Sequence, residues 1–212
     1  MTERLKIILA DIPCGKVFAD IGCDHGYIAK AMLISGKCER VIISDISAKC
    51  LSKAEKLLEN EIRLGKATSV VSDGFEKVFG ADVALIAGMG GEEISAIIDR
   101  DNLPENLVIQ PMKNPEKARM RAGERGYKIV KDRVFKSAGK FYDLIVLKKG
   151  KEMLTQEEIE FGRDNLNGDN PDFKERIQVE VSKMENYLNR ENLSEKTRLE
   201  ISARLEKYRK YV

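Results

Sequence analysis

The chain has 212 residues, of which 42% are hydrophobic and 34% are charged, and its formal net charge is +2. This length and composition predict one globular domain with a sizeable core and room for a small appendage. The near balance of charge excludes a chain that is basic throughout, so any surface that binds nucleic acid must be local.

Composition excludes several further classes of protein. No stretch approaches the roughly 20 consecutive apolar residues of a membrane span, and the amino-terminal MTERLKIILADIP lacks the features of a signal peptide. We therefore expect a soluble, cytoplasmic protein. Because there is one histidine and no CxxC pair, neither a metal site nor a disulfide framework is expected; the cysteines are Cys14, Cys23, Cys38 and Cys50.

Short apolar runs alternate with longer amphipathic segments up to about residue 150. Nearly continuous apolar runs are typical of strands buried on both faces of a parallel sheet. Five such β-then-α units predict a doubly wound α/β domain. In chain order, the predicted strands are 16–21, 40–45, 68–72, 82–87 and 106–110, and the predicted helices are 27–35, 47–64, 92–100 and 115–125.

The strand pattern ends in a hairpin. Runs 128–136 and 140–148 flank a short turn with the sequence SAG, which favours an antiparallel pair over another crossover. No strand pattern follows residue 150. We expect residues 1–150 to form one domain and residues 151–212 to form a second, helical one.

The tail carries apolar residues at helical spacing. They extend from Phe173 to Leu188 and again from Leu199 to Tyr208. Between them, Asn192-Leu193-Ser194 breaks the pattern and offers Ser194 as an N-cap. The tail is therefore predicted to be two long helices folded against each other as a coiled-coil-like hairpin.

Basic residues are concentrated in one window. Residues 151–212 hold 12 Lys and Arg against 14 Asp and Glu, whereas residues 1–150 hold 25 against 21. Within the first part, residues 113–136 carry a net charge of +6 beside the carboxyl edge of the predicted sheet, where α/β proteins bind ligands. A solvated face is the ordinary alternative for such a run.

A glycine-containing loop, DIGCDHGY, joins the first strand to its helix. Gly22 allows a sharp turn and close approach of a ligand to the backbone. The spacing to Gly26 is not that of a dinucleotide fingerprint, and Asp24 would repel a pyrophosphate, which counts against NAD and ATP. A positively charged ligand fits this loop better.

Acidic residues end the next two strands. Asp45 is placed to accept hydrogen bonds from the hydroxyls of a ribose, and Asp73-Gly74 suits an adenine amino group. Each Asp alone is as readily a helix cap, but Asp20, Asp45 and Asp73 at one edge of a sheet favour a ligand site.

Two further strand ends carry distinctive residues. The fourth strand runs into AGMGG, whose glycines Gly88, Gly90 and Gly91 suggest close approach of the backbone to a ligand. The fifth ends in Gln110-Pro111, where Gln110 could hydrogen-bond the edge of a base.

Together these motifs resemble a known family. The segments DIGCDHGYI, ISDIS, SDGFEKV, IAGMGGEEI, VIQP with EKARMRAGERGY, and GKFYDLIVL resemble the bacterial tRNA adenine-22 N1-methyltransferases. That family belongs to the class I methyltransferases that depend on S-adenosylmethionine. The resemblance covers residues 1 to about 148 and implies a Rossmann-like sheet of seven strands with an antiparallel last strand. The tail resembles the family's coiled-coil domain.

The resemblance implies roles for individual residues. S-adenosylmethionine would be the cofactor, tRNA the partner, and no metal would take part. The family commonly has serine where Cys23 stands, and a thiol is the weaker hydrogen-bond donor. By motif, the methionine part of the cofactor would contact Asp20, Gly22, Cys23 and Gly26, the ribose Asp45 with Ile46, the adenine Asp73 and Gly74, and the sulfonium region Gly88 and Met89.

Substrate-side roles are hypotheses built on the same resemblance. Asp24 is our choice for stabilising the cationic product ring or accepting a proton, with His25 beside it and Tyr27 as a stacking surface for an extruded base. Backbone contact of His25 is the alternative for that side chain. Besides Gln110 and Pro111, the substrate-binding residues are expected to be Lys113, Arg119, Arg121 and Arg125, as contacts to tRNA phosphates.

Two other functions stay open from the residues alone. One is a methyltransferase acting on a different substrate, although AGMGG replaces the NPPY-like tetrad of enzymes that methylate amino groups of nucleic acids. The other is a nucleotide-sensing or RNA-binding module that keeps the pocket without catalysis. The sequence does not indicate the oligomeric state, nor which tRNAs would be modified.

Overall fold

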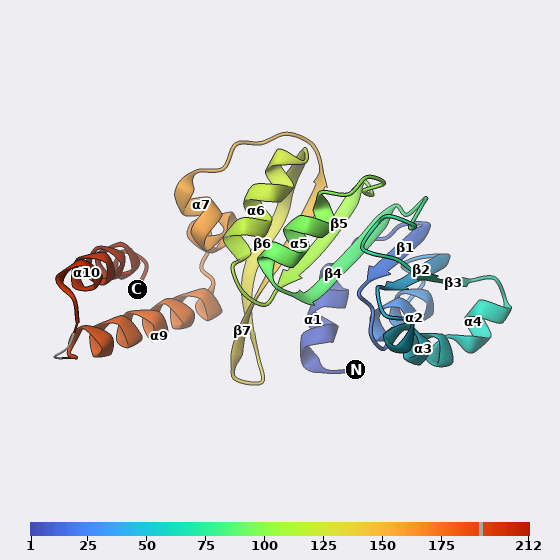
Figure 1. Ribbon diagram of the computed structural model, residues 1–212, viewed down its shortest axis with the longest axis horizontal. Helices are drawn as coiled ribbons and strands as arrows, with labels where there is room; N and C mark the ends of the chain where they lie inside the picture. Colours follow the sequence, from blue (N-terminus) through green and yellow to red (C-terminus); the bar gives the residue numbers. More distant parts are fainter. Residues whose placement is uncertain (191–192) are drawn as a thin grey trace.

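The computed structural model describes residues 1–190 and 193–212. Its centre is a seven-stranded sheet in the order β3-β2-β1-β4-β5-β7-β6 (Figure 1). The first five strands are parallel, and β7 is antiparallel to both β5 and β6. The α/β fold class and the antiparallel last strand are therefore confirmed. The strands are β1 (Val17–Ile21), β2 (Arg40–Asp45), β3 (Ala67–Val71), β4 (Val83–Met89), β5 (Asn106–Pro111), β6 (Tyr127–Ser137) and β7 (Lys140–Lys149).

Helices cover both faces of the sheet. All five residues of β1 are buried, with Phe18 on one face and Ala19 on the other, as its continuous apolar run predicts. The first face packs against α1 (Glu3–Asp11), α2 (Tyr27–Ile34) and α3 (Ala48–Leu57), and the second against α5 (Gly91–Ile98) and α6 (Pro115–Glu124). The strand order reverses between β1 and β4, which places a crevice at their carboxyl ends.

The β6–β7 hairpin turns at Ala138 and Gly139, with φ of 48° and 74°. Positive φ at both central residues is typical of two-residue hairpin turns, because the twist of such a turn matches the twist of the flanking strands. Asn106 of β5 pairs with Lys148 of β7, so the hairpin closes the edge of the parallel sheet. The predicted hairpin is confirmed.

One prediction about the helices of the first 150 residues is wrong, and one helix is not predicted. The expected single helix 47–64 is broken at Leu58 into α3 and α4 (Glu59–Arg63), because Leu58 leaves helical geometry with ψ of 17°. The amino terminus, for which the sequence analysis predicts no helix, forms α1. Its N-cap is Thr2, and its Ile8 is fully buried, so this helix is part of the core.

The described residues of the tail form four helices rather than two. They are α7 (Gln156–Phe161), α8 (Arg163–Asn167), α9 (Pro171–Leu188) and α10 (Glu195–Arg209). Gly162 separates α7 from α8 with φ of 85°, and a Cβ there would lie 2.7 Å from Oδ1 of Asp132. A residue other than glycine could not bring the chain so close to β6.

The paired helices α9 and α10 extend away from the sheet (Figure 1). Ser194 caps α10 as predicted, whereas Asn192 lies outside the described residues. Leu199 was expected in the apolar seam but is 66% exposed. The seam also takes in Val134 of β6, so the helical part packs on the hairpin; its standing as a separate domain remains a prediction.

Within the described part of the chain, none of the helices is both long and apolar enough to cross a membrane. The same residues contain no cluster of three or more histidine, cysteine or acidic side chains arranged to hold a metal ion.

Candidate active site

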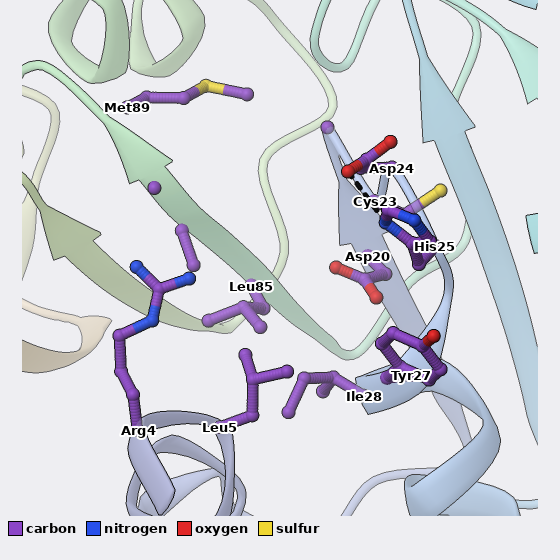
Figure 2. A pocket seen from close by; sticks show the side chains of 13 residues that line it. Arg4, Leu5, Asp20, Cys23, Asp24, His25, Tyr27, Ile28, Leu85 and Met89 are labelled. Carbon is purple, nitrogen blue, oxygen red and sulfur yellow. Dashed lines mark ion pairs between the residues drawn. The ribbon is translucent and has the colours of Figure 1, made fainter. Parts of the chain in front are cut away.

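Two neighbouring cavities lie at the carboxyl edge of the parallel strands. The first, about 350 Å³, is bounded by α1, the end of β1, the start of α2 and the end of β4 (Figure 2). The second, about 340 Å³, lies between the ends of β2 and β3 and helix α5. Gly22 and Met89 line both cavities. Four of the five strand ends that the sequence singles out, those of β1 to β4, thus meet at one site.

Asp20 is the buried acid of the first cavity. It is 6% exposed on β1, and burial raises the pKa of its carboxyl to about 7, with only partial relief from the backbone of Ala29. No basic side chain of the described residues contributes to this shift. A carboxylate that lacks a cation in a desolvated site gains stability when a cationic ligand arrives.

The loop after β1 is held in an unusual backbone conformation. Gly22, Asp24 and Gly26 have φ of 70°, 38° and 68°. A Cβ on Gly26 would lie 2.9 Å from Cβ of Ala54, so glycine also lets α2 approach α3 closely. Left-handed geometry is costly for Asp24, and such strain is typical of ligand-binding loops.

Asp24, His25 and Tyr27 form one connected group at the rim. Asp24 accepts from Nζ of Lys53 at 2.9 Å and contacts Nδ1 of His25 at 2.7 Å. The hydrogen bond from Lys53 is the largest cause that lowers the pKa of the Asp24 carboxyl. The rings of His25 and Tyr27 stack with centroids 5.4 Å apart. Asp24 is therefore an anion at neutral pH, beside an exposed aromatic surface.

Cys23 lines the first cavity, where the charges of Asp20 and Asp45 act on it. Burial, followed by the charges of Asp20 and Asp45, raises the pKa of its thiol. The side chain therefore stays neutral, and a neutral thiol is a poor nucleophile.

The second cavity is lined by acids from two strand ends. Oδ1 of Asp45 accepts from the backbone N–H of Ser47 at 2.8 Å, which fixes the carboxylate at the end of β2. Asp73 accepts from Arg100 of the loop after α5 at 2.6 Å. Ile46, 71% exposed, forms part of the wall.

The AGMGG segment borders the first cavity with Gly88 and both cavities with Met89. A Cβ on Gly22 would lie 2.1 Å from the methyl carbon of Met89, so that side chain reaches across to the β1 loop. Gly88 has φ of 82°, and a Cβ there would meet nothing within 4 Å, so its backbone borders open space. Gly91 packs on the backbone of Asn114, where a Cβ would lie 2.0 Å from the carbonyl oxygen.

Comparison with known families matches residues 18–210 to the model of the tRNA (adenine(22)-N(1))-methyltransferases. The chain belongs to this family. A relative with that activity from Bacillus subtilis is 28% identical over 161 residues, covering 71% of this chain and 66% of its own length.

Solved structures agree with the assignment of this chain to the methyltransferase family. M. capricolum TrmK, in complex with S-adenosyl-homocysteine, is 27% identical with a TM-score of 0.89, covering 100% of this chain and 97% of its own. B. subtilis TrmK is 22% identical with a TM-score of 0.87 over 100% and 98%, and supports the fold. The methyltransferase uses S-adenosylmethionine, the cofactor of its family.

The two cavities fit that cofactor. Together they offer a carboxylate at the end of β2 for a ribose, an open backbone at Gly88, and the buried acid Asp20 for a cationic group. Every predicted cofactor residue except Gly26 lines one of them; Gly26 instead shapes the loop.

One expected phosphate contact of the methyltransferase is wrong. Arg119 is 0% exposed, and it donates to Asp132 at 2.7 and 2.9 Å and to Asp143 at 2.9 Å. Asp143 also accepts from Arg176 of α9 at 2.7 Å. Arg119 therefore joins the sheet to the tail and does not reach solvent.

Among the described residues, six of the other eight basic residues of the 113–136 window form ion pairs with acids that lie outside the window, and Lys113 and Lys128 do not. Arg121 pairs with Asp99 and Glu124, and Arg125 donates to the carbonyl oxygen of Arg100. Ion pairs also join Lys117 to Glu92 and Lys136 to Glu175, and Asp11 pairs with both Lys131 and Arg133. Lys113 is exposed beside Gly90. The window is thus less basic as a surface than as a sequence.

Gln110 and Pro111 are buried and line neither cavity. Nε2 of Gln110 donates to the carbonyl oxygen of Pro111 at 2.9 Å, and its Oε1 accepts from Arg4 at 3.3 Å. The structure therefore does not present Gln110 to a base, and the predicted contact is not supported.

Sequence reasoning missed Arg4, Leu5 and Lys53. The first two enter the first cavity from α1, and Lys53 reaches Asp24 from α3. No motif marks them, but Thr2 before an amphipathic run signals an amino-terminal helix.

Proposed function

We propose that the two cavities divide the work of transferring a methyl group from S-adenosylmethionine to N1 of adenine 22 in tRNA. The second cavity takes the adenosine, and the first takes the methionine end and the target base. The observation that carries this proposal is the meeting of both cavities at Gly22 and Met89, beside the open backbone of Gly88. When bound, the cofactor would supply a methyl group on a sulfonium: the ring nitrogen would bond to the methyl carbon as the carbon–sulfur bond breaks, and S-adenosyl-homocysteine would leave.

The second cavity orients the adenosine. Asp45 has one oxygen fixed by Ser47, which leaves its other oxygen to accept from a ribose hydroxyl. Asp73 and Gly74 border the space for the adenine. The ion pair with Arg100 holds Asp73 in place for that contact.

The rim group acts on the target base. Tyr27 is 46% exposed and offers a ring face on which an extruded adenine can stack. Methylation at N1 makes the ring cationic, and the Asp24 carboxylate stabilises that charge. Because Lys53 lowers the pKa of Asp24, we assign it this electrostatic role rather than proton abstraction.

Binding of tRNA follows from location and charge. Lys113 stands exposed next to the AGMGG segment and, with Arg121 and Arg125 at the end of α6, is our choice for phosphate contacts. Because the last two already pair with acids or a carbonyl, each contact requires exchange of those partners. A tRNA substrate places the enzyme in the cytoplasm.

The test is single-turnover methyl transfer to unmodified tRNA at saturating cofactor, followed by mapping of the modified nucleoside. We expect 1-methyladenosine at position 22 and a rate about tenfold lower for Asp24→Asn, with unchanged binding of S-adenosyl-homocysteine. The control is Glu39→Gln, at an exposed residue before β2 that lines neither cavity. Product at another position would contradict the function, and normal turnover of Asp24→Asn would contradict the role of that residue.

A further inference from the structure

The acidic residue at the rim of the first cavity is not held in place by packing. The side chain of Asp24 is 53% exposed, and its φ of 38° lies in the left-handed region. Figure 2 shows it in the loop after β1, near His25 and Tyr27. An exposed side chain keeps its rotamer freedom unless specific contacts fix it, so the direction of this carboxylate depends on its hydrogen bonds.

Each oxygen of the Asp24 carboxylate has a partner of its own. Oδ2 lies 2.7 Å from Nδ1 of the adjacent His25, and Oδ1 accepts from Nζ of Lys53 at 2.9 Å. Among residues 1–190 and 193–212, Lys53 is the one partner of this carboxylate from outside the loop. Contacts to both oxygens fix the plane of the carboxylate, and the contact to Lys53 ties it to a second element of the fold.

The helix that carries Lys53 is anchored independently of this contact. Helix α3 buries Leu51 and Ala54, which are 1% and 0% exposed. Nζ of Lys30 on α2 donates to the carbonyl oxygen of Leu57 at 2.8 Å, which also joins α2 to α3. The Lys53 ammonium therefore reaches the loop from a fixed support, and the support does not depend on Lys53.

Lys53 is charged and lines neither cavity. The hydrogen bond to Asp24 is the largest cause that raises the pKa of the Lys53 ammonium, and the same bond lowers the pKa of the Asp24 carboxyl. Asp45 and Cys50 are the other titratable groups that act on Lys53, with smaller effects. Both partners are thus ionised at neutral pH, and Lys53 acts on a ligand in the first cavity through Asp24.

We propose that Lys53 is a positioning residue for the methyl transfer, holding the Asp24 carboxylate in the direction from which it stabilises the cationic adenine ring. This inference rests on the role of Asp24 in the proposed function. A charge that is oriented before the reaction does not have to turn while charge develops on the ring. Because both side chains are exposed to water, direct repulsion between Lys53 and the ring is screened, and the orientation of Asp24 outweighs it.

A phosphate of the tRNA is the other group that an exposed lysine near the cavity could contact. Positioning is favoured because Nζ of Lys53 already donates to Asp24 from a fixed helix. A phosphate contact would raise the dissociation constant of tRNA and reduce its salt dependence, with no change in rate at saturating tRNA. Positioning predicts the opposite, a lower rate at saturating tRNA with unchanged binding.

A double-mutant cycle tests the proposal, measured as single-turnover methylation of unmodified tRNA with cofactor and tRNA saturating. The full-length variants are Lys53→Met, Lys53→Arg, Asp24→Asn, the double variant of Lys53→Met with Asp24→Asn, and the control Lys56→Met. Lys56 is an exposed lysine of the same helix and lines neither cavity.

We expect Lys53→Met to lower the rate about three- to tenfold and to leave the affinities for S-adenosyl-homocysteine and tRNA within about twofold of wild type. Lys53→Arg should recover most of the rate. The double variant should be no slower than Asp24→Asn alone, since Lys53 acts through Asp24. Lys56→Met should behave as wild type.

Four outcomes would overturn the inference. Losses that multiply in the double variant would show that Lys53 does not act through Asp24. An unchanged or faster rate for Lys53→Met would exclude positioning, and an unchanged rate with weakened tRNA binding would assign Lys53 to a phosphate. Lost affinity for S-adenosyl-homocysteine, with a urea midpoint below that of Lys56→Met, would show a structural role. A normal rate for Asp24→Asn would remove the role on which the inference rests.

The same measurements separate this inference from the proposed function. Methylation of another nucleoside by the wild type would count against the function itself. A slow Asp24→Asn beside a normal Lys53→Met would refute only the role of Lys53.

Discussion

Replacing Arg119 by methionine separates a structural role from the phosphate contact that the sequence predicts. The guanidinium is fully buried between α6 and the β6–β7 hairpin and donates two hydrogen bonds to Asp132 and one to Asp143. It also donates to the carbonyl oxygen of Ile159 at 3.2 Å, which ties α7 to the sheet. Methionine keeps much of the aliphatic volume and none of the charge.

The size of the effect follows from what the substitution leaves behind. Asp143 keeps its ion pair with Arg176 at 2.7 Å, but Asp132 is 0% exposed and would lose the cation that it pairs with. Breaking a buried ion pair from one side costs about 3–5 kcal/mol, a large part of the roughly 5–15 kcal/mol that stabilises a domain. The exposed pairs of Arg121 are worth at most about 1 kcal/mol, so Arg121→Met is the matched control.

Urea unfolding followed by far-ultraviolet circular dichroism measures the difference, since the chain has no tryptophan. We expect Arg119→Met to lower the free energy of unfolding by about 3–5 kcal/mol. Adding Asp132→Leu should restore much of the lost free energy of unfolding, because two apolar side chains then replace a buried carboxylate that has no cation. Stability of Arg119→Met within about 1 kcal/mol of wild type, together with a raised KM for tRNA, would refute this reasoning.

Three other predictions follow from the site, the AGMGG segment and the tail. Burial raises the pKa of Asp20 to about 7, and only the ionised carboxylate attracts a cationic group. If Asp20 contacts the cofactor as predicted, affinity for S-adenosyl-homocysteine should fall by up to about tenfold per unit as pH drops below 7. Asp20→Asn should lose this slope in calorimetry, and an identical slope would contradict the assignment. Gly91→Ala forces a Cβ against the Asn114 carbonyl and should lower the free energy of unfolding by more than Gly36→Ala does. Gly36→Ala adds only the cost of a left-handed backbone, about 1–2 kcal/mol. Equal urea midpoints for the two variants would argue against this close packing. Ending the chain after Gly150 removes the helices that cover Val134, so the truncated protein should unfold at lower urea than the full chain; an unchanged midpoint would show that the sheet folds independently.

Much of the fold could be read from local patterns. Continuous apolar runs predict buried parallel strands, and the end of each run locates Asp20, Asp45 and Asp73 at one edge whatever the details of packing. The SAG turn predicts the hairpin because its geometry is set by the turn residues themselves. These predictions need only a few neighbouring residues, and the structure places them as expected.

Charge is where sequence reasoning failed. Residues 113–136 do carry a net charge of +6, but their basic side chains form ion pairs with acids outside that window. Asp11 of α1 pairs with Lys131 and Arg133, and Asp99 pairs with Arg121. A sequence window contains no information on which distant acids will face it. The net charge of a sequence window therefore predicts a basic surface only where its basic side chains stay exposed and have no acidic partner.

The sequence by itself determined the sheet, the glycine-rich ligand edge and the acids that line it, because each depends on chain direction and on residues adjacent in sequence. Only the tertiary structure decided that Arg119 is buried in ion pairs and that Arg4 lines the first cavity. Arg119 meets an acid 24 residues away, and Arg4 meets Gln110 across 106 residues. Burial and pairing of a charged side chain are set by such long-range contacts, and these exist only once the helices have packed on the sheet.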